Sequence, residues 1–354
     1  IVLAAAVDLD TRAAVADNGQ NCIRLFSEGY CLYEIPLPAG EPQADAYGTT
    51  ASLISGVAAR FAALGYPVRG FDAYVESRVL SGSGLSSSAA FEVLIGVILN
   101  HMGSCGLSAA EIAKIGQYAE NVYFGKPCGL MDQTASAVGN IITIDFADHD
   151  HPKIEPLDFD FSACGYSLCI IDSGASHADL TDCYAAITNE LKAVCACFGK
   201  EVLRDIPEED FYRDLPAVRQ KVGDRAVLRA IHVYEENKRV KNQVAALRRN
   251  DFDTFLQLAA ASGESSWMLL QNVIPEGRVR AQEMAYALTV TAHLLDGHGA
   301  CRVHGGGFAG TIQAFVPNDR RDAFRAEIER LLGAGSCHVL SIRPEGGILM
   351  EECR

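Results

Sequence analysis

Short apolar runs and longer helical patterns follow one another along the chain. A helix is predicted over residues 49–64, where Gly65 ends it, and another over 88–102, which is apolar on every side and should be buried. A third helix is predicted to begin at Ser108, where Glu111 completes a capping box, and to run to about residue 122. Buried strands are predicted for IITIDF, YSLCIID and TIQAFV.

Other patterns describe the two ends of the chain. Two apolar runs flank Asn18-Gly19, a dipeptide typical of hairpins, so a hairpin is predicted there. A long helix is predicted over residues 224–249, and its basic side chains are interpreted as a solvated face. The polar, proline-bearing stretch 149–165 separates two halves, so we expect domains at 1–160 and 161–354.

Composition narrows the functional classes. The chain has 354 residues, 49% of them hydrophobic, and a formal net charge of −15. Such acidity argues against nonspecific binding to nucleic acid or to anionic membranes, so an anion such as ATP would have to be bound locally. The twelve cysteines are scattered without metal-ligand spacing, and neither a signal peptide nor a membrane span is expected. These features favour a reduced, cytoplasmic protein.

SGSGLSSSAA, residues 81–90, leads directly into the predicted buried helix. Gly82 and Gly84 leave the backbone open to a ligand, and Ser86–Ser88 stand where N-capping serines belong. A helix N-terminus offers unsatisfied N–H groups and partial positive charge, so the segment predicts a phosphate site. A Gly/Ser turn with a serine cap is the alternative.

AENVYFGKPCGLMDQTAS, residues 119–136, carries two acids near a turn that Pro127 and Gly129 are expected to force. One of Glu120 and Asp132 could bind a divalent cation, and the other could accept a proton from a hydroxyl. Two ordinary surface acids are the alternative, and Lys126 is interpreted as solvated. A third segment, RVHGGGFAGTIQAFV, predicts a tight glycine-rich loop before a strand.

Taken together and in this order, the three segments resemble the motifs of the GHMP small-molecule kinases. SGSGLSSSAA is similar to that family's phosphate loop, and GGGFAG to its glycine-rich third motif. PCGLMDQ resembles the signature of the galactokinases, and the remaining sequence is similar to bacterial galactokinases, particularly those of Firmicutes. The resemblance implies an α+β fold of two lobes, the first like ribosomal protein S5 domain 2 and the second ferredoxin-like.

The resemblance also implies roles for individual residues. Asp132 would be the catalytic base, Gly129 and Tyr184 would contact the sugar, and Ser88 and Glu120 would ligate Mg²⁺. The ATP phosphates would be held by the loop residues Gly82, Ser83, Gly84, Leu85, Ser86, Ser87 and Ser88.

The implied activity is ATP- and Mg²⁺-dependent phosphorylation of the C1 hydroxyl of galactose by a monomer or dimer. The alternatives are a kinase for N-acetylgalactosamine or L-arabinose, or a sugar and ATP sensor with little catalysis. Galactokinases carry a GEHTD-type sugar-binding segment, and no such run occurs in the 354 residues. We therefore expect this sequence to be a fragment of a longer gene product.

Overall fold

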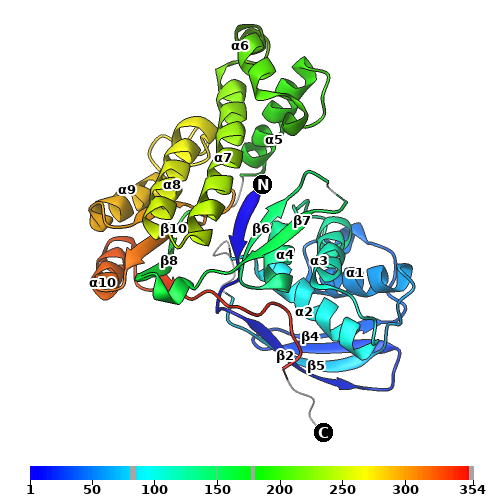
Figure 1. The fold of residues 1–354 in the computed structure, drawn as a ribbon. Coiled ribbons are helices and arrows are strands. Elements are labelled where there is room, and N and C mark those ends of the chain that lie inside the picture. Colours follow the sequence, from blue (N-terminus) through cyan, green and yellow to red (C-terminus); the bar gives the residue numbers. More distant parts are fainter. Residues whose placement is uncertain (80–84, 149, 177–179, 351–354) are drawn as a thin grey trace. The chain divides into compact units, whose positions relative to one another are not determined.

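The computed structural model describes residues 1–79, 85–148, 150–176 and 180–350 (Figure 1). The chain divides into two compact units, called here the N-terminal unit (Ala4–Ile144 with Ile342–Arg354) and the C-terminal unit (Ile1–Leu3 with Asp145–Ser341). The predicted domain boundary at residue 160 remains a prediction.

Strands and helices are mixed throughout the described residues, as the sequence predicts. The strands are β1 (Val2–Ala5), β2 (Thr11–Asp17), β3 (Cys22–Ser27), β4 (Leu32–Pro36), β5 (Phe71–Ser77), β6 (Ile141–Asp145), β7 (Lys153–Leu157), β8 (Tyr166–Asp172), β9 (Ala300–Val303), β10 (Thr311–Pro317) and β11 (Cys337–Leu340). The α-helices are α1 (Thr50–Ala63), α2 (Ser87–Met102), α3 (Ala109–Tyr118), α4 (Met131–Val138), α5 (Thr181–Cys197), α6 (Glu208–Val222), α7 (Asp224–Arg248), α8 (Phe252–Ser265), α9 (Glu283–Leu295) and α10 (Arg321–Leu332). The predicted helices at 49–64, 88–102 and 224–249 are confirmed, as is the Ser108–Glu111 capping box.

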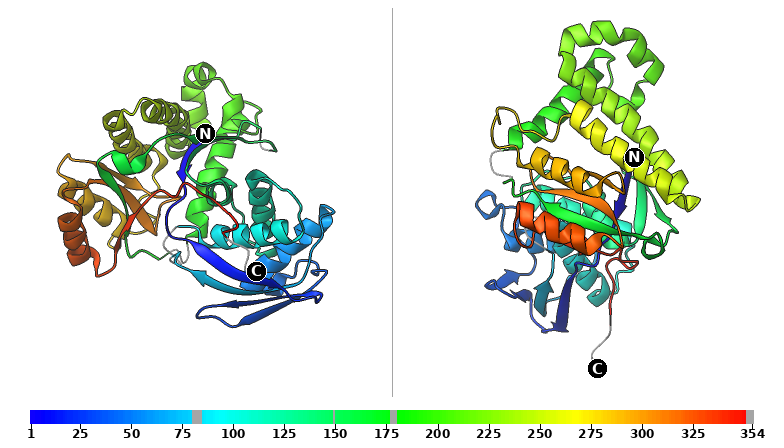
Figure 2. Two further views of the ribbon diagram at one scale, coloured as in Figure 1. Left: turned by 60° about the horizontal axis from the view of Figure 1, so that its bottom comes forward. Right: turned by 90° about the vertical axis from the view of Figure 1, so that its left-hand side faces the viewer.

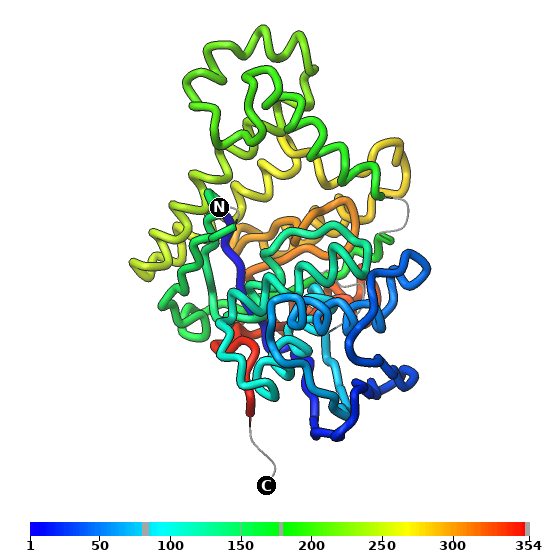
Figure 3. Tube along the Cα trace, turned by 90° about the vertical axis from the view of Figure 1, so that its right-hand side faces the viewer, coloured from blue at the N-terminus to red at the C-terminus, as the bar shows by residue number. Residues whose placement is uncertain are grey.

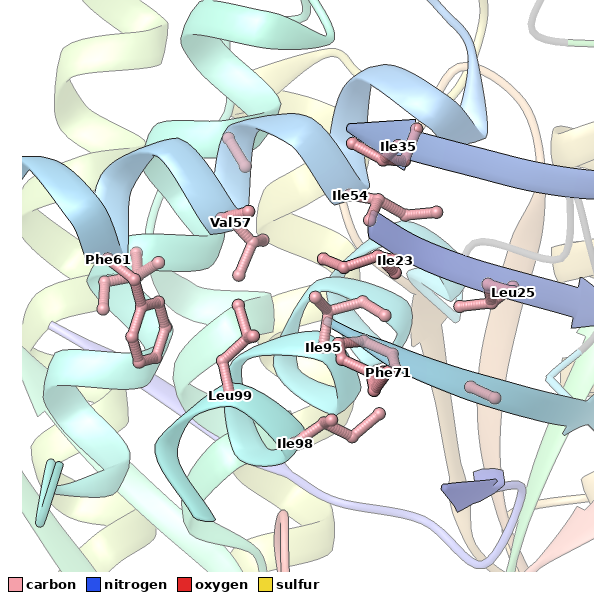
Figure 4. Close-up of a cluster of buried hydrophobic side chains, with 14 of the residues drawn as sticks. Ile23, Leu25, Ile35, Ile54, Val57, Phe61, Phe71, Ile95, Ile98 and Leu99 are labelled. Atoms are coloured by element: carbon pink, nitrogen blue, oxygen red, sulfur yellow. The ribbon is translucent and has the colours of Figure 1, made fainter. Parts of the chain in front are cut away.

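The N-terminal unit is built on a four-stranded sheet of order β2-β5-β3-β4. β3 and β5 run parallel, with Ile23 opposite Phe71, and the other two pairs are antiparallel. Helices α1 and α2 contribute the apolar side chains that bury this sheet's inner face (Figure 4). The labelled side chains in that core are Ile23, Leu25, Ile35, Ile54, Val57, Phe61, Phe71, Ile95, Ile98 and Leu99.

The predicted hairpin at Asn18-Gly19 is wrong. The chain does turn there, and Gly19 has a φ of +61°. However, β5 lies between β2 and β3, so the two strands on either side of the turn are not hydrogen-bonded to each other. The Asn18 amide donates to the Cys22 carbonyl at 3.0 Å and to Asp72 Oδ1 at 2.8 Å, so the turn is tied both to the start of β3 and to β5, about fifty residues later.

The C-terminal unit contains an antiparallel four-stranded sheet of order β11-β8-β10-β9. Helices α9 and α10 pack against it (Figure 2). Phe324 and Ile328 of α10 are buried in the apolar core of this unit. Helices α5, α6 and α7 contribute the side chains of a second apolar cluster in this unit. In the trace these helices run from green to yellow-green (Figure 3). A further sheet of the molecule has the order β1-β6-β7.

The solvated interpretation of the basic residues on α7 is wrong for Arg229, whose side chain is only 2% exposed. Its guanidinium donates to Glu190 Oε2 at 2.9 Å and to the Leu270 carbonyl at 3.1 Å. A buried charge is stable only with such partners, and none of them is near Arg229 in the sequence. The sequence pattern therefore predicted correctly that Arg229 lies in a helix, but it did not predict that the side chain is buried.

Residues 342–350 return to the N-terminal unit. The Arg343 carbonyl accepts a hydrogen bond from Asn140 N at 2.8 Å, and Gly347 N donates to the Ala137 carbonyl at 3.2 Å. A Cβ on Gly346 would lie 2.1 Å from the Ala137 carbonyl oxygen, so only glycine allows this approach. The segment thereby braces the C-terminal end of α4.

Gly56 of α1 allows a close helix contact that bears on the candidate site. A Cβ there would lie 2.8 Å from the Ala119 Cβ and 2.9 Å from the Tyr123 Cβ, in the turn that follows α3. We expect Gly56→Ala to lower the free energy of unfolding by about 1–3 kcal/mol, because overpacking outweighs the gain in helix propensity. Urea unfolding of the wild type and of Gly56→Ala measures this difference in the free energy of unfolding.

Gly40→Ala is the matched control, since a Cβ at Gly40 meets nothing within 4 Å. It should leave stability unchanged or slightly raised. A Gly56→Ala protein as stable as the Gly40→Ala protein would contradict the close contact.

Candidate active site

Ser86 is the N-cap residue of α2, and it is half-buried. Ser86 has left-handed backbone angles, φ 50° and ψ 58°, and its side chain makes no capping hydrogen bond to the helix. Its hydroxyl instead donates to Asp132 Oδ2. The predicted N-cap position is therefore correct, but the predicted capping function of the Ser86 side chain is wrong.

The predicted phosphate loop is described only in part. Gly82, Ser83 and Gly84 lie outside the described residues, whereas Leu85 and Ser86–Ser88 lie within them and are half-buried. The Ser86 hydroxyl is bonded to Asp132, so it does not accept a hydrogen bond from the first backbone N–H groups of α2. Those N–H groups are therefore not capped by Ser86. A helix start of this kind can receive an anion through its backbone amides.

Glu120 lies in a π-helical turn, Ala119–Tyr123, that continues α3. Its side chain is only 3% exposed, so the alternative that Glu120 is an ordinary surface acid is wrong. Single π-helical turns inside α-helical segments are rare overall, but those that occur are often found at functional sites. No local sequence pattern predicted this turn.

The Glu120 carboxylate is held on both oxygens. Oε1 accepts a hydrogen bond from Ser88 Oγ at 2.9 Å, and Oε2 accepts one from Gln133 Nε2 at 2.8 Å. The Gln133 amide also donates to Glu92 Oε2 at 3.0 Å. Two carboxylates and one amide thus form a buried network behind the start of α2.

Glu92 was not predicted as a site residue. It is fully buried in α2, and this burial, followed by the nearby charge of Glu120, raises the pKa of Glu92 to about 8. Its position as the one charged residue in the apolar run 89–99 was a usable signal, because a buried acid needs a reason. Gln133 was missed because a lone glutamine carries no such signal.

Asp132 and Gln133 are neighbours in the first turn of α4 with opposite environments. Asp132 is exposed and accepts the Ser86 hydrogen bond, whereas Gln133 is 1% exposed. The Asp132 side chain therefore lies outward, toward the start of α2, and the Gln133 side chain lies inward, against Glu92 and Glu120. Asp132 is available to a ligand, and its neighbour is not.

The turn between Glu120 and Asp132 differs from the prediction. The glycine with left-handed φ is Gly125, at +76°, whereas Gly129 has ordinary backbone angles and open space around it. Cys128 N donates to Asn121 Oδ1 at 2.7 Å, which closes the turn. Lys126 is exposed as predicted, yet its ammonium lies 3.4 Å from Glu120 Oε1.

The donor set fits a small hard cation only with help from a substrate. Mg²⁺ prefers oxygen ligands and uses one or two protein groups beside phosphates and water. Ser88 Oγ and Glu120 Oε1 supply two neighbouring oxygens. Within the described ranges there is no group of three His, Cys, Asp or Glu side chains that could hold a metal alone.

Tyr184 contacts the glycine-rich loop of the C-terminal unit. Its hydroxyl donates to the Gly307 carbonyl at 2.8 Å, and a Cβ on Gly306 would lie 3.0 Å from the tyrosine ring. The Asn272 amide donates to the Gly306 carbonyl at 3.1 Å. A side chain at 306 would therefore press on the tyrosine ring, and the predicted sugar contact of Tyr184 stays a prediction.

Comparison with known families identifies the class of protein. The family model described as GHMP kinases N terminal domain matches residues 52–140, which include most of α1, all of α2, the π-helical turn and Asp132. The galactokinase of Streptomyces coelicolor is 30% identical over 327 residues, covering 91% of this chain and 80% of that relative. The chain belongs to the galactokinase family.

Other relatives match over a shorter part. The galactokinase of Glaesserella parasuis is 35% identical over 262 residues, and that of Actinobacillus pleuropneumoniae serotype 5b is 35% identical over 257 residues. Each match covers 73% of this chain, but the chain spans only 64% of the length of these two relatives.

Solved structures confirm the predicted α+β, two-lobed kinase fold. The Lactococcus lactis galactokinase, solved with galactose, has a TM-score of 0.80 at 24% identity and covers 97% of this chain and 88% of its own. A mevalonate kinase from Methanococcus jannaschii has a TM-score of 0.61 at 15% identity. Within the part of the chain that the structure describes, no helix is long and apolar enough to cross a membrane.

Glu92 should make the stability of the protein depend on pH. Between about pH 4.5 and 8, the folded protein keeps a proton on Glu92 that the unfolded chain releases. The free energy of unfolding should therefore fall by up to about 1.4 kcal/mol per pH unit from this group as pH rises through that window. Glu92→Gln removes this titrating group, so the free energy of unfolding of the variant should fall less steeply with rising pH than that of the wild type.

Urea unfolding at several pH values in EDTA measures the difference. Glu76→Gln is the control, because Glu76 is exposed on β5 and its loss should leave the wild-type pH dependence in place. Parallel curves for wild type and Glu92→Gln would contradict the raised pKa.

Proposed function

We propose that the protein is an ATP- and Mg²⁺-dependent galactokinase that transfers the γ-phosphoryl group of ATP to the C1 hydroxyl of galactose. Membership of the galactokinase family supports this activity. The observation that carries the proposal is the hydrogen bond from Ser86 to Asp132. It holds an exposed carboxylate at the start of α2, where a phosphate-binding helix end is predicted.

The start of α2 would bind the ATP phosphates. Its backbone N–H groups carry the positive end of the helix dipole. Ser87 and Ser88, the first two residues of the helix, add hydroxyl groups there. Gly82, Ser83, Gly84 and Leu85 would complete the loop. A net charge of −15 makes such local binding necessary, because the protein as a whole repels an anion.

Asp132 would act on the sugar hydroxyl. The C1 oxygen forms a bond to the γ-phosphorus, the bond from that phosphorus to the bridging oxygen breaks, and its electron pair leaves on ADP. Asp132 either takes the hydroxyl proton as a general base, or orients the hydroxyl in a loose transition state from which the proton leaves to solvent. Galactose 1-phosphate and ADP are the products. Tyr184 and Gly129 are the predicted sugar contacts.

Ser88 and Glu120 are the residues that would hold Mg²⁺ together with ATP. When bound, the cation would neutralise charge on the phosphates. The fit rests on two neighbouring oxygens, one of them from a buried carboxylate. We further propose a cytoplasmic location, because every cysteine within the described residues is a free thiol. A monomer or dimer remains the expected oligomeric state.

Asp132→Asn tests the assignment of the base. The amide oxygen can still accept the Ser86 hydrogen bond but cannot take a proton, so kcat should fall by about 10²–10⁴-fold. ATP affinity should remain close to that of the wild type. A coupled ADP-release assay with galactose and Mg-ATP measures turnover, and calorimetry measures ATP binding.

The control is Asp158→Asn, an exposed aspartate of the C-terminal unit, which should leave kcat unchanged. Turnover by Asp132→Asn within tenfold of the wild type would sink the assignment. ATP and galactose binding without ADP release by the wild type would favour a sensor.

A further inference from the structure

The buried Gln133 amide joins two carboxylates, and only one of these is a candidate cation ligand. We propose that Glu92 and Gln133 are positioning residues that fix the orientation of the Glu120 carboxylate, with Oε2 held inward and Oε1 left for the cation. This inference rests on the proposed function, because it assigns Glu120 to the cation site.

The hydrogen bonds give the two Glu120 oxygens different partners. Oε2 accepts the inward bond from Gln133, whereas Oε1 lies on the side of the Ser88 hydroxyl and the Lys126 ammonium. A rotation of the carboxylate would break the Gln133 bond inside a site that water does not reach. Because the two oxygens of a carboxylate are chemically equivalent, Gln133 fixes the plane of the Glu120 carboxylate, so that one oxygen is held inward and the other faces Ser88.

Gln133 is itself held by Glu92. Its amide nitrogen donates to Glu92 Oε2 at 3.0 Å, and it also lies 3.6 Å from Cys128 Sγ. Glu92 comes from α2, Gln133 from α4 and Glu120 from the π-helical turn, so three separate elements meet at this one amide. The Glu92 bond keeps the amide nitrogen, rather than its oxygen, turned toward Glu120.

Stability does not explain why Glu92 is there. Glu92 Oε1 and Gln133 Oε1 are buried and have no hydrogen-bond partner within the described residues. Buried polar atoms without partners destabilise a fold, and apolar side chains of similar volume are often equally or more stable at such positions. A polar pair kept in spite of this is better explained by its effect on Glu120.

The test separates metal affinity from stability. Binding of Mn²⁺ in the presence of a nonhydrolysable ATP analogue is followed by electron paramagnetic resonance for the wild type, Glu92→Met, Gln133→Met and Glu92→Gln. Glu92→Met should weaken Mn²⁺ binding by about 10-fold or more without loss of stability, because an outer partner of a ligand is removed. Gln133→Met should weaken it similarly.

Glu92→Gln is the conservative rescue. Its amide oxygen can still accept the Gln133 hydrogen bond, so Mn²⁺ affinity should stay close to the wild-type value. For Glu92→Met, excess Mg²⁺ should restore much of the lost ADP release. Val57→Ala, in the apolar core of the same unit, controls for loss of stability and should bind Mn²⁺ normally.

Glu120→Gln distinguishes the two possible failures. If this change does not weaken Mn²⁺ binding, the cation site of the proposed function is wrong. If it does, but Glu92→Met and Gln133→Met bind Mn²⁺ like the wild type, the positioning proposal alone is overturned. The same holds if Glu92→Met weakens Mn²⁺ binding only as much as an equally destabilised Val57→Ala protein.

Discussion

The candidate site depends on one buried amide placed between two acids. Gln133 donates to both Glu92 and Glu120, and neither carboxylate has access to bulk water. Two acids this close would repel each other if both were charged, and burial together with this repulsion raises the pKa of Glu92. Glu92 is thereby favoured as the neutral partner of the pair.

The fold brings these groups together through close helix packing. Gly56 allows α1 to lie against the π-helical turn that carries Glu120, and residues 342–350 brace the end of α4. Asp132 and Gln133 then point in opposite directions from the first turn of α4. The same short helix therefore provides an exposed carboxylate for chemistry and a buried amide that orders its surroundings.

Local patterns predicted several of the helices and strands, and motif resemblance predicted the family. The long apolar run gave α2, and the Ser108–Glu111 pair gave the start of α3, because both signals act within a few residues. Longer-range features were missed. The Asn18-Gly19 hairpin failed because β5 inserts between the strands, and the burial of Arg229 and the role of Gln133 depend on partners 39 and 41 residues away.

A crystal structure with Mn²⁺ and a nonhydrolysable ATP analogue tests the central claim most directly. Anomalous scattering locates the metal without reference to the protein. The account predicts a manganese peak bonded to Ser88 Oγ and Glu120 Oε1, with Gln133 still donating to Glu120 Oε2. A peak bonded to Glu120 Oε2 with Gln133 displaced, or one that touches neither Ser88 nor Glu120, would contradict it.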